Sequence, residues 1–344
     1  MVHIIGFGGR TAVGITAFTS AAAVRAAIAM FDEHPFMIDQ YGERMIVAMD
    51  AVLSVDIEGV ERFVELGLSA AQEALAPLAK IINNIPAIDI LIGLPSPRPG
   101  LPEHLSKEVS NQFNEQLRRW VSVHTVETFN CGHSAGLLAV QEGWHKILGG
   151  TTSICLVGGI ESYHEPETLE WLDEHDQLHS ENNSWGYTPG EGAGFCLLCA
   201  DEVVKRYRLQ TFGQILSAAT AYEKNLIKTD TICLGEGLSA AVKQVVHALP
   251  SSDTKINFTI CDMNGEHYRG DEFGYMVVRT GEYFIDPTDF MIPAECWGDV
   301  GAASGPLSII LALVAHLKSY SKGPYTLIFT SSESGERTAL LLRT

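Results

Sequence analysis

Two patterns of apolar residues alternate along the chain, and they predict strands followed by helices. The runs "IDILIGL" (88–94) and "SICLVGG" (153–159) are short and almost wholly apolar, as in strands that are buried on both faces. The stretch "SAGLLAVQEGWHKIL" instead places Leu137, Val140 and Trp144 at helical spacing. Strands alternating with helices are typical of mostly parallel sheets covered by helices. The predicted fold class is therefore α/β.

The same order of predicted elements occurs twice, at an almost constant distance along the chain. The pentapeptide "GLSAA" begins at Gly67 and again at Gly237, an offset of 237 − 67 = 170, and we expect each copy to open a helix. A strand follows each copy, from Ile88 and from Ile256, with an offset of 256 − 88 = 168. A shared order at a shared offset indicates an internal duplication.

The duplication also relates two turns that lead into helices rich in small residues. These turns begin at Cys131 and Asp299, and their offset is 299 − 131 = 168. The sequence therefore predicts two related halves, residues 1–205 and 206–344, with a polar, acidic insertion at 161–184 in the first. Pseudo-symmetry would bring the two turns together near the midline, so we expect Cys131 to face Asp299.

The sequence "TFNCGHSAGLL" places Cys131 between a predicted strand (121–128) and the start of a helix. The first amides of a helix are unpaired, and the helix dipole favours negative charge there. A thiol at such a place can have a lowered pKa and act as a nucleophile. A buried, inert cysteine is the alternative that the cysteine alone leaves open.

Composition and charge exclude several partners. With 42 acidic and 23 basic residues the formal net charge is −19, which opposes binding to nucleic acid or to an anionic membrane surface. An acidic protein partner would need a local cluster of basic residues. The best candidates are "KRYR" (205–208) and the pair Arg118 and Arg119, and we expect both to be solvated helix ends.

Other features of the sequence favour a cytoplasmic protein. No apolar run is long enough to span a bilayer, and the first residues, "MVHIIGFGG", lack the basic and apolar segments of a signal peptide. Seven cysteines, an odd number without scaffold-like spacing, fit a reducing compartment better than a disulfide framework.

Two motifs that suggest metal or cofactor binding are weak. His175 and His179 stand at i, i+4, a spacing that can hold a metal on a helix, but the glutamate of a metalloprotease motif is missing. The stretch "GFGGRTAVG" near the N-terminus lacks the glycine spacing of a dinucleotide-binding loop. We therefore expect no metal and no cofactor.

Four motifs, in order along the chain, resemble those of the β-ketoacyl synthases of the thiolase superfamily. They are "CGHSAGLLAV" at Cys131, "GGIES" (158–162), "GYTPGEGAGFCLL" (186–198) and "GDVGAASGPL" (298–307). The resemblance covers essentially the whole chain. It implies a thiolase-like, five-layered αβαβα fold with two duplicated halves, a homodimer, and a cysteine that accepts an acyl group.

The family's two further catalytic residues have been replaced. Its His-Gly-Thr motif is here Asn264-Gly265-Glu266, and its second histidine or asparagine is Asp299. Asparagine cannot shuttle a proton, and an ionised aspartate would repel a developing oxyanion unless its pKa were raised. His133 and His267 are the only nearby imidazoles that might substitute. Glu266 and Asp299 could instead form a carboxylate pair in which one is protonated.

The C-terminal loop also departs from the family, whose Gly-Phe-Gly-Gly segment supplies an oxyanion amide and a gating phenylalanine. Here the segment is "SESGERTAL" (332–340), in which Gly335 can keep the turn but no phenylalanine remains. We expect Glu336 and Arg337 to pair with each other or with Asp299.

Two hypotheses of function follow. In the first, the chain is an acyltransferase that forms an acyl-thioester on Cys131 from an acyl carrier protein or coenzyme A thioester. Its altered catalytic set would comprise Asn264, Glu266, His267 and Asp299. In the second, the chain is a catalytically inactive, synthase-like scaffold or partner subunit, as the loss of both histidines suggests.

Overall fold

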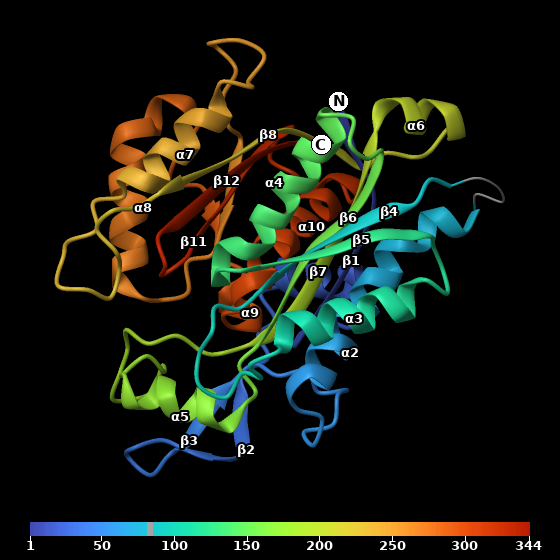
Figure 1. The fold of residues 1–344 in the computed structure, drawn as a ribbon. Helices are drawn as coiled ribbons and strands as arrows, with labels where there is room; N and C mark the ends of the chain where they lie inside the picture. Colours follow the sequence, from blue (N-terminus) through green and yellow to red (C-terminus); the bar gives the residue numbers. More distant parts are fainter. Residues whose placement is uncertain (81–84) are drawn as a thin grey trace.

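The computed structural model describes residues 1–80 and 85–344, and most of its strands belong to one large sheet (Figure 1). The strands have these bounds: β1 (Val2–Thr11), β2 (Asp32–Ile38), β3 (Arg44–Val47), β4 (Ile88–Leu94), β5 (Val123–Asn130), β6 (Ile154–Ser162), β7 (Glu191–Ala200), β8 (Gly213–Tyr222), β9 (Phe258–Cys261), β10 (Phe290–Met291), β11 (Tyr325–Ser331) and β12 (Glu336–Arg343). The helices have these bounds: α1 (Ala17–Arg25), α2 (Gly59–Leu75), α3 (Leu105–Leu117), α4 (Ala135–Leu148), α5 (Pro166–Glu174), α6 (Asp201–Tyr207), α7 (Glu236–Val246), α8 (His267–Thr280), α9 (Ala294–Trp297), α10 (Ser304–Leu317), and the 3₁₀ turns η1 (Ala76–Lys80), η2 (Gly132–Ser134), η3 (Gly281–Tyr283) and η4 (Gly301–Ala303).

The sheet consists of two five-stranded parts with the same topology. Its order is β10-β9-β11-β12-β8-β1-β7-β6-β4-β5. In one part β4 is parallel to β5 and β6, while β7 is antiparallel to β6 and β1. In the other part β9 is parallel to β10 and β11, while β12 is antiparallel to β11 and β8. A short antiparallel contact between β1 and β8 joins the two parts.

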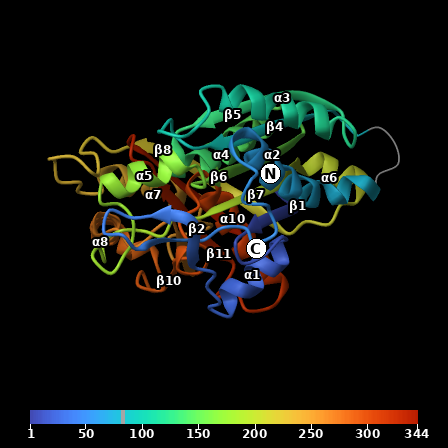
Figure 2. The same ribbon diagram turned by 90° about the horizontal axis from the view of Figure 1, so that it is seen from below.

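Helices cover both outer faces of the sheet and fill the space between its parts (Figures 1 and 2). Helices α4 and α10 contact strands of both parts, whereas α2 and α3 pack only on the N-terminal part and α7 packs on the C-terminal part with α8 against it. The duplicated, five-layered αβαβα fold is therefore confirmed. The boundary after residue 205 stays a prediction, and it falls within α6.

Each layer contact has its own apolar core. The central one surrounds α4 and α10 and includes Leu137, Leu307 and Ile310, which are at most 2% exposed. A second core lies under α2 and α3, and a third lies under α7 and α8. Because α10 is buried nearly all round, its sequence is apolar on every face rather than on one stripe.

The glycines near the N-terminus serve packing, not phosphate binding. They lie inside β1, where α2 crosses closely. A Cβ atom at Gly6 would lie 2.1 Å from the carbonyl oxygen of Ala74, and one at Gly8 would lie 2.1 Å from that of Ala70. Glycine is required where a helix backbone approaches a strand so closely.

The two "GLSAA" copies do not lie at equivalent places in their helices. The copy at Gly237 opens α7 as expected, but α2 begins at Gly59, so the copy at Gly67 lies inside that helix. The expected helix start at Gly67 is wrong because the preceding residues continue the apolar face of α2, where Phe63 and Leu66 are fully buried.

The insertion at 161–184 packs against the hairpin β2–β3 rather than only covering the surface. Leu169 and Leu172 of α5 are buried with Met45 and Val47 in a small apolar cluster. The two histidines of the possible metal pair do not share a helix, because α5 ends with His175 as its C-cap. Among the described helices, none has both the length and the apolar composition needed to cross a membrane.

Candidate active site

Cys131 stands at the strand-to-helix turn that the sequence predicted. Strand β5 ends at Asn130, Cys131 is the N-cap of η2, and α4 follows directly. The turn is possible because Gly132 adopts a left-handed φ of 72°, which a glycine tolerates without strain. The Cys131 residue is half-buried.

The thiol of Cys131 is not activated. Burial and the nearby negative charge of Glu336 raise its pKa to about 12, and a hydrogen bond with Ser332 opposes them only in part. The amide of Ser134 in the same turn is occupied, because it donates to Ser332 Oγ at 2.8 Å. Of the two alternatives that the cysteine alone left open, the raised pKa favours the inert cysteine over the activated nucleophile.

Asp299 lies in the equivalent turn of the second half, and its carboxylate is fully occupied by donors. It accepts hydrogen bonds from His133 Nε2 at 2.8 and 3.0 Å, from Asn264 Nδ2 at 2.6 Å and from the amide of Gly301 at 2.7 Å. Burial alone would raise its pKa, but the charges of His133 and Arg269 outweigh burial and hold the pKa of Asp299 well below its usual range. Asp299 is ionised and accepts hydrogen bonds only.

His133, and not Cys131, is the side chain that faces Asp299. The turns η2 and η4 do meet at the midline, as pseudo-symmetry predicted. Burial lowers the pKa of the His133 imidazole, but the adjacent Asp299 raises it further, so the net shift is upward. His133 therefore acts as a buried cation that is paired with Asp299.

A residue that the sequence did not single out, Arg269 on α8, completes this group. Its guanidinium contacts Glu266 through Nε at 3.1 Å and Asp262 through Nη1 at 3.2 Å, and Nη1 also donates to the carbonyl of Ser331 at 3.0 Å. Its Nη2 atom lies 3.3 Å from Nε2 of His133. The carboxylates around it keep the pKa of Arg269 well above its usual range despite complete burial.

Asn264 and Glu266 are both held in the same group. The amide nitrogen of Asn264 donates to Glu266 Oε2 at 3.0 Å as well as to Asp299. Burial would raise the pKa of Glu266, but Arg269 and Lys228 lower it overall. Glu266 and Asp299 are therefore both ionised, and the predicted pair with one protonated carboxyl is wrong.

We call this group the midline network. It contains acidic and basic side chains in equal number, together with one amide: Asp262, Glu266, Asp299, His133, Lys228, Arg269 and Asn264.

The remaining predicted site residues lie elsewhere. His267 is exposed, and its ring packs against Trp185 at a centroid distance of 5.4 Å, outside the midline network. His267 is the first residue of α8, directly after the N-cap Glu266, and it lines a pocket together with Glu266 rather than contacting Asn264 or Asp299. Its expected approach to the site is wrong.

The C-terminal loop makes other pairs than those expected. Arg337 donates through Nε to Glu272 at 2.6 Å and through Nη1 to the carbonyl of Ser332. The carboxylate of Glu336 accepts from Ser334 instead. Arg337 does contact Glu336, but only at its backbone carbonyl, to which Nη1 donates at 3.3 Å. The expected pairing of the Glu336 carboxylate with Arg337, or of either side chain with Asp299, is wrong for the described residues.

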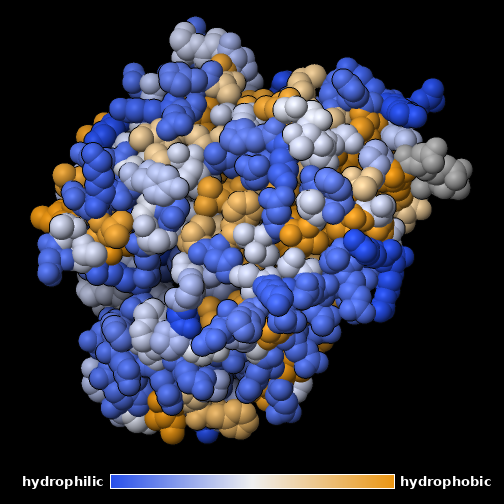
Figure 3. All heavy atoms as spheres, in the orientation of Figure 1, coloured by the Kyte–Doolittle hydropathy of each residue, from blue (hydrophilic) through white to orange (hydrophobic). Residues whose placement is uncertain are grey.

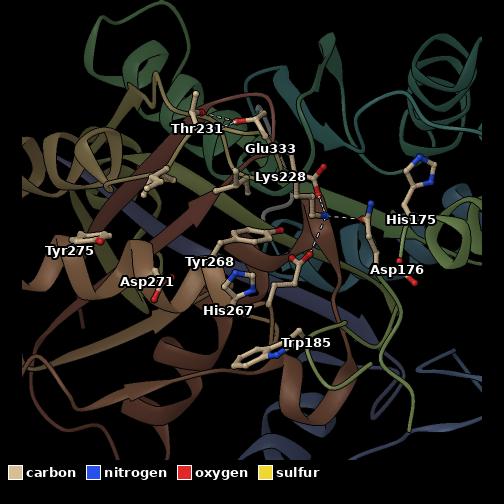
Figure 4. A pocket seen from close by; sticks show the side chains of 16 residues that line it. His175, Asp176, Trp185, Lys228, Thr231, His267, Tyr268, Asp271, Tyr275 and Glu333 are labelled. Atoms are coloured by element: carbon tan, nitrogen blue, oxygen red, sulfur yellow. Dashed lines mark hydrogen bonds and ion pairs between the residues drawn. The ribbon is translucent and has the colours of Figure 1, made fainter. Parts of the chain in front are cut away.

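A pocket of about 710 Å³ lies beside the midline network (Figure 4). Trp185, His267 and Tyr268 line it, and Glu266 belongs both to its wall and to the network. Lys228 also lines the pocket. It binds Glu266 at 3.1 Å and pairs with Glu333, so it too belongs to both the pocket and the network. This pocket is the opening through which a ligand would come nearest to the network.

One group of possible metal ligands occurs in the part of the chain that the structure describes, namely Glu223, Cys233 and Glu272. Its carboxylates already have partners, since Glu223 accepts from the amide of Gly237 and Glu272 from Arg337. The guanidinium of Arg337 also repels a cation, so the group fits a structural contact better than a metal centre.

Comparison with known proteins confirms the resemblance to the ketosynthases. Residues 122–203 match the sequence model of the family described as "Beta-ketoacyl synthase, N-terminal domain". No curated protein matches the sequence.

Solved structures match the fold over nearly the whole chain. A ketosynthase from module 6 of the bacillaene synthase of Bacillus subtilis 168 is 14% identical, with a TM-score of 0.78 over 99% of this chain and 72% of that one. The ishigamide ketosynthase/chain length factor is 17% identical, with a TM-score of 0.74 over 99% of each chain. A chain of the complex AntDE:AntF, a type II PKS acyl-carrier protein with its ketosynthase bound to the hexaketide, is 12% identical. Its TM-score is 0.80, over 100% of this chain and 98% of that one.

Proposed function

We propose that this chain is a ketosynthase-like subunit that does not itself catalyse decarboxylative condensation. In this proposal it assembles with a catalytically complete ketosynthase that extends an acyl chain carried by an acyl carrier protein, in fatty acid or polyketide biosynthesis. The observation that carries the proposal is the midline network. It includes Asn264 and Asp299, the two positions that resemble the catalytic histidine positions of the family. Both side chains already form hydrogen bonds within the network.

The network has no donor to spare for a developing enolate. Both N–H bonds of Asn264 are directed to carboxylates, Glu266 and Asp299. The Asp299 carboxylate would repel an oxyanion rather than stabilise it. Removal of one oxyanion donor commonly costs about 3 kcal/mol or more of transition-state stabilisation, and here both donors are lost.

The state of Cys131 supports the same conclusion. A pKa raised from 9.0 to about 12 leaves roughly a thousandfold less thiolate at neutral pH. Within the described residues no imidazole or guanidinium contact to its sulfur is found. The imidazole of His133 is paired with Asp299, and the guanidinium of Arg269 is paired with Asp262 and Glu266. The nucleophile of a working synthase needs such an activating group.

An unpaired strand edge offers a place for the partner. Strand β5 ends the sheet, pairs only with β4, and leads directly to Cys131 (Figure 1). Apolar side chains gather along the middle of this face, over β5 and α4 (Figure 3), and Val126 and Phe129 of β5 are only half-buried. An open edge of this kind can pair with a strand of a second chain.

The assembly and its location remain parts of the proposal. One structural neighbour is described as a ketosynthase together with a chain length factor, and another includes an acyl-carrier protein, which supports an assembly that acts on a carrier-bound chain. A homodimer would use the same edge of β5. The cytoplasm is the expected compartment.

A second candidate is transfer of an acyl group to Cys131 from an acyl carrier protein or coenzyme A thioester. It is favoured by the half-buried position of Cys131 at the start of η2, which a thioester can reach. This activity would not require the lost histidines if the acceptor supplied its own base.

Intact-mass spectrometry separates the two candidates. The purified chain and a Cys131→Ala control are exposed at pH 7.5 to acyl-coenzyme A and to acyl carrier thioesters. The proposed non-condensing subunit predicts no mass addition in either protein. Mass addition to the wild type alone would show that Cys131 is not inert and would establish acyl transfer.

A further inference from the structure

Two adjoining cavities lie between α1 and the C-terminal end of α10, and they share Arg25 and Tyr320. Their volumes are about 170 and 480 Å³. We call them together the α1–α10 groove, and its main lining residues are Phe18, Arg25, Leu311, Val314, Lys318 and Tyr320. Figure 2 shows α1 at the lower edge of that view, away from α5 and α8. The groove shares no lining residue with the pocket of Figure 4.

Basic side chains border this groove and lie over its aromatic rings. The Arg25 guanidinium is 4.1 Å from the centroid of the Tyr320 ring, and Lys318 Nζ is 5.3 Å from that of Phe18. Neither cation forms an ion pair with another residue of the ranges 1–80 and 85–344. Cation–π contacts of this kind hold the charges at the border while both remain available to an anionic partner.

The segment around α1 exposes several apolar side chains. Phe18, which lines the groove, is more than 40% exposed, and so are Ile15, Ile28, Met30 and Phe31, which precede or follow α1 in the sequence. Exposed apolar side chains gathered near one element commonly mark an interaction site. Apolar walls with cations at the border are complementary to a helix that has an apolar face and acidic flanks.

We propose that the α1–α10 groove binds an acidic amphipathic helix of a partner protein. The apolar face of that helix lies between α1 and α10, and its carboxylates pair with Arg25 and Lys318. The proposal does not depend on the function proposed above, because the groove lies apart from Cys131 and the midline network.

Charge complementarity favours this occupant over the others. The chain carries a formal net charge of −19, so an acidic partner is repelled by most of its surface and attracted where unpaired cations meet apolar side chains. A second copy of the chain would bring the same net charge. Among the basic residues that stood out in the sequence, Lys205 is already paired with Asp201 within α6.

The test uses a fluorescein-labelled, 18-residue peptide with leucine on one helical face and glutamate on the other, and a scrambled peptide of the same composition. Fluorescence anisotropy is measured with the wild type, with Arg25→Glu/Lys318→Glu, and with Arg118→Glu/Arg119→Glu. The last variant is the matched control, because it makes the same change of charge at exposed residues that end α3.

We expect saturable binding of the amphipathic peptide that weakens with added salt. The groove variant should weaken it at least tenfold, the control variant less than twofold, and the scrambled peptide should bind at least tenfold more weakly. Phe18→Ser, which keeps both cations, should weaken binding severalfold. Circular dichroism verifies that each variant is folded.

Equal affinity for all variants, equal affinity for the scrambled peptide, or no binding would overturn the proposal. Sedimentation of the same proteins tests the competing occupant. If the wild type and the control variant form dimers while the groove variant is a monomer, the groove is filled by a second copy and the proposal is wrong.

Discussion

The two turns that lead into η2 and η4 hold equivalent places in the two halves, but they carry opposite chemistry. The first turn presents Cys131 half-buried, with a raised pKa and no cation beside it. The second turn buries Asp299 with hydrogen bonds from His133, Asn264 and a backbone amide. The first turn presents a neutral, half-buried thiol, and the second buries a charged carboxylate.

The comparison shows which carboxylates the buried cations of this site neutralise. His133 arises from the first turn, yet its imidazole crosses to the carboxylate of the second. Arg269 likewise serves Glu266 and Asp262 in the second half. Because the second turn holds these cations, Cys131 has none. At the midline the structure therefore stabilises buried ion pairs around Asp299.

Removal of Arg269 should have the largest effect of these changes, and we expect it in the stability of the protein. Arg269→Met removes the cation that pairs with the buried carboxylate of Asp262 and leaves Glu266 with Lys228 alone, which we expect to lower the free energy of unfolding by about 3–5 kcal/mol. Urea denaturation followed by circular dichroism measures the loss. Arg118→Met, at an exposed position, should change stability by less than about 0.5 kcal/mol. If Arg269→Met loses as little stability as this control, Arg269 does not stabilise the midline network as the structure indicates.

Neutralising Asp299 should reverse the titration of His133. In Asp299→Asn the attraction that raises the pKa of His133 is gone, while burial and Arg269 still lower it. We expect the pKa of His133 to move from above its ordinary value of about 6.5 to below it. NMR titration of the imidazole C–H signal, assigned with His133→Gln, measures the shift. An unchanged pKa would show that the pair with Asp299 is not formed.

The same pair should make stability depend on pH in a defined direction. The folded pKa of His133 is raised, so its contribution is complete below the unfolded value of about 6.5 and is lost as pH rises through the folded pKa. Asp299 stays ionised throughout this range, because its pKa is lowered. The stability difference between the wild type and His133→Gln should therefore narrow from pH 6.5 upward. A difference that widens would contradict this assignment.

A change of charge beside Cys131 should have a smaller effect, which we expect in the reactivity of its thiol. Iodoacetamide should alkylate Cys131 slowly at pH 7, with a rate that rises about tenfold per pH unit and shows no plateau below pH 10. Glu336→Gln removes the carboxylate that disfavours the thiolate and should raise the rate severalfold. Cys131→Ala supplies the background from the other cysteines, all of which are buried. A plateau near pH 7 would show an activated thiol.

The sequence predicted the fold well because the fold depends on local patterns. Apolar runs located β4 to the residue and β6 to within three residues, and the constant offset of repeated elements anticipated two parts of the sheet with one topology. The start of α2 was missed because its apolar face continues upstream of the small residues around Gly67.

The site was less predictable because its chemistry comes from contacts between distant segments. Cys131 and Glu336 lie more than 200 residues apart, so no local pattern shows that the thiol is disfavoured. In the sequence Arg269 looks like any surface arginine of a helix. Only the structure shows that three carboxylates surround it. The one local signal was the joint replacement at Asn264 and Asp299, which indicated an altered site without identifying its new partners.

The most direct test of the central claim is release of carbon dioxide from a malonyl-carrier thioester. The purified chain is supplied with an acyl-carrier thioester, and labelled carbon dioxide and the 3-oxoacyl product are measured beside Cys131→Ala, with a complete ketosynthase as positive control. A non-condensing subunit predicts that the wild type and Cys131→Ala release equal, background amounts and form no product. Product formation that requires Cys131 would contradict it.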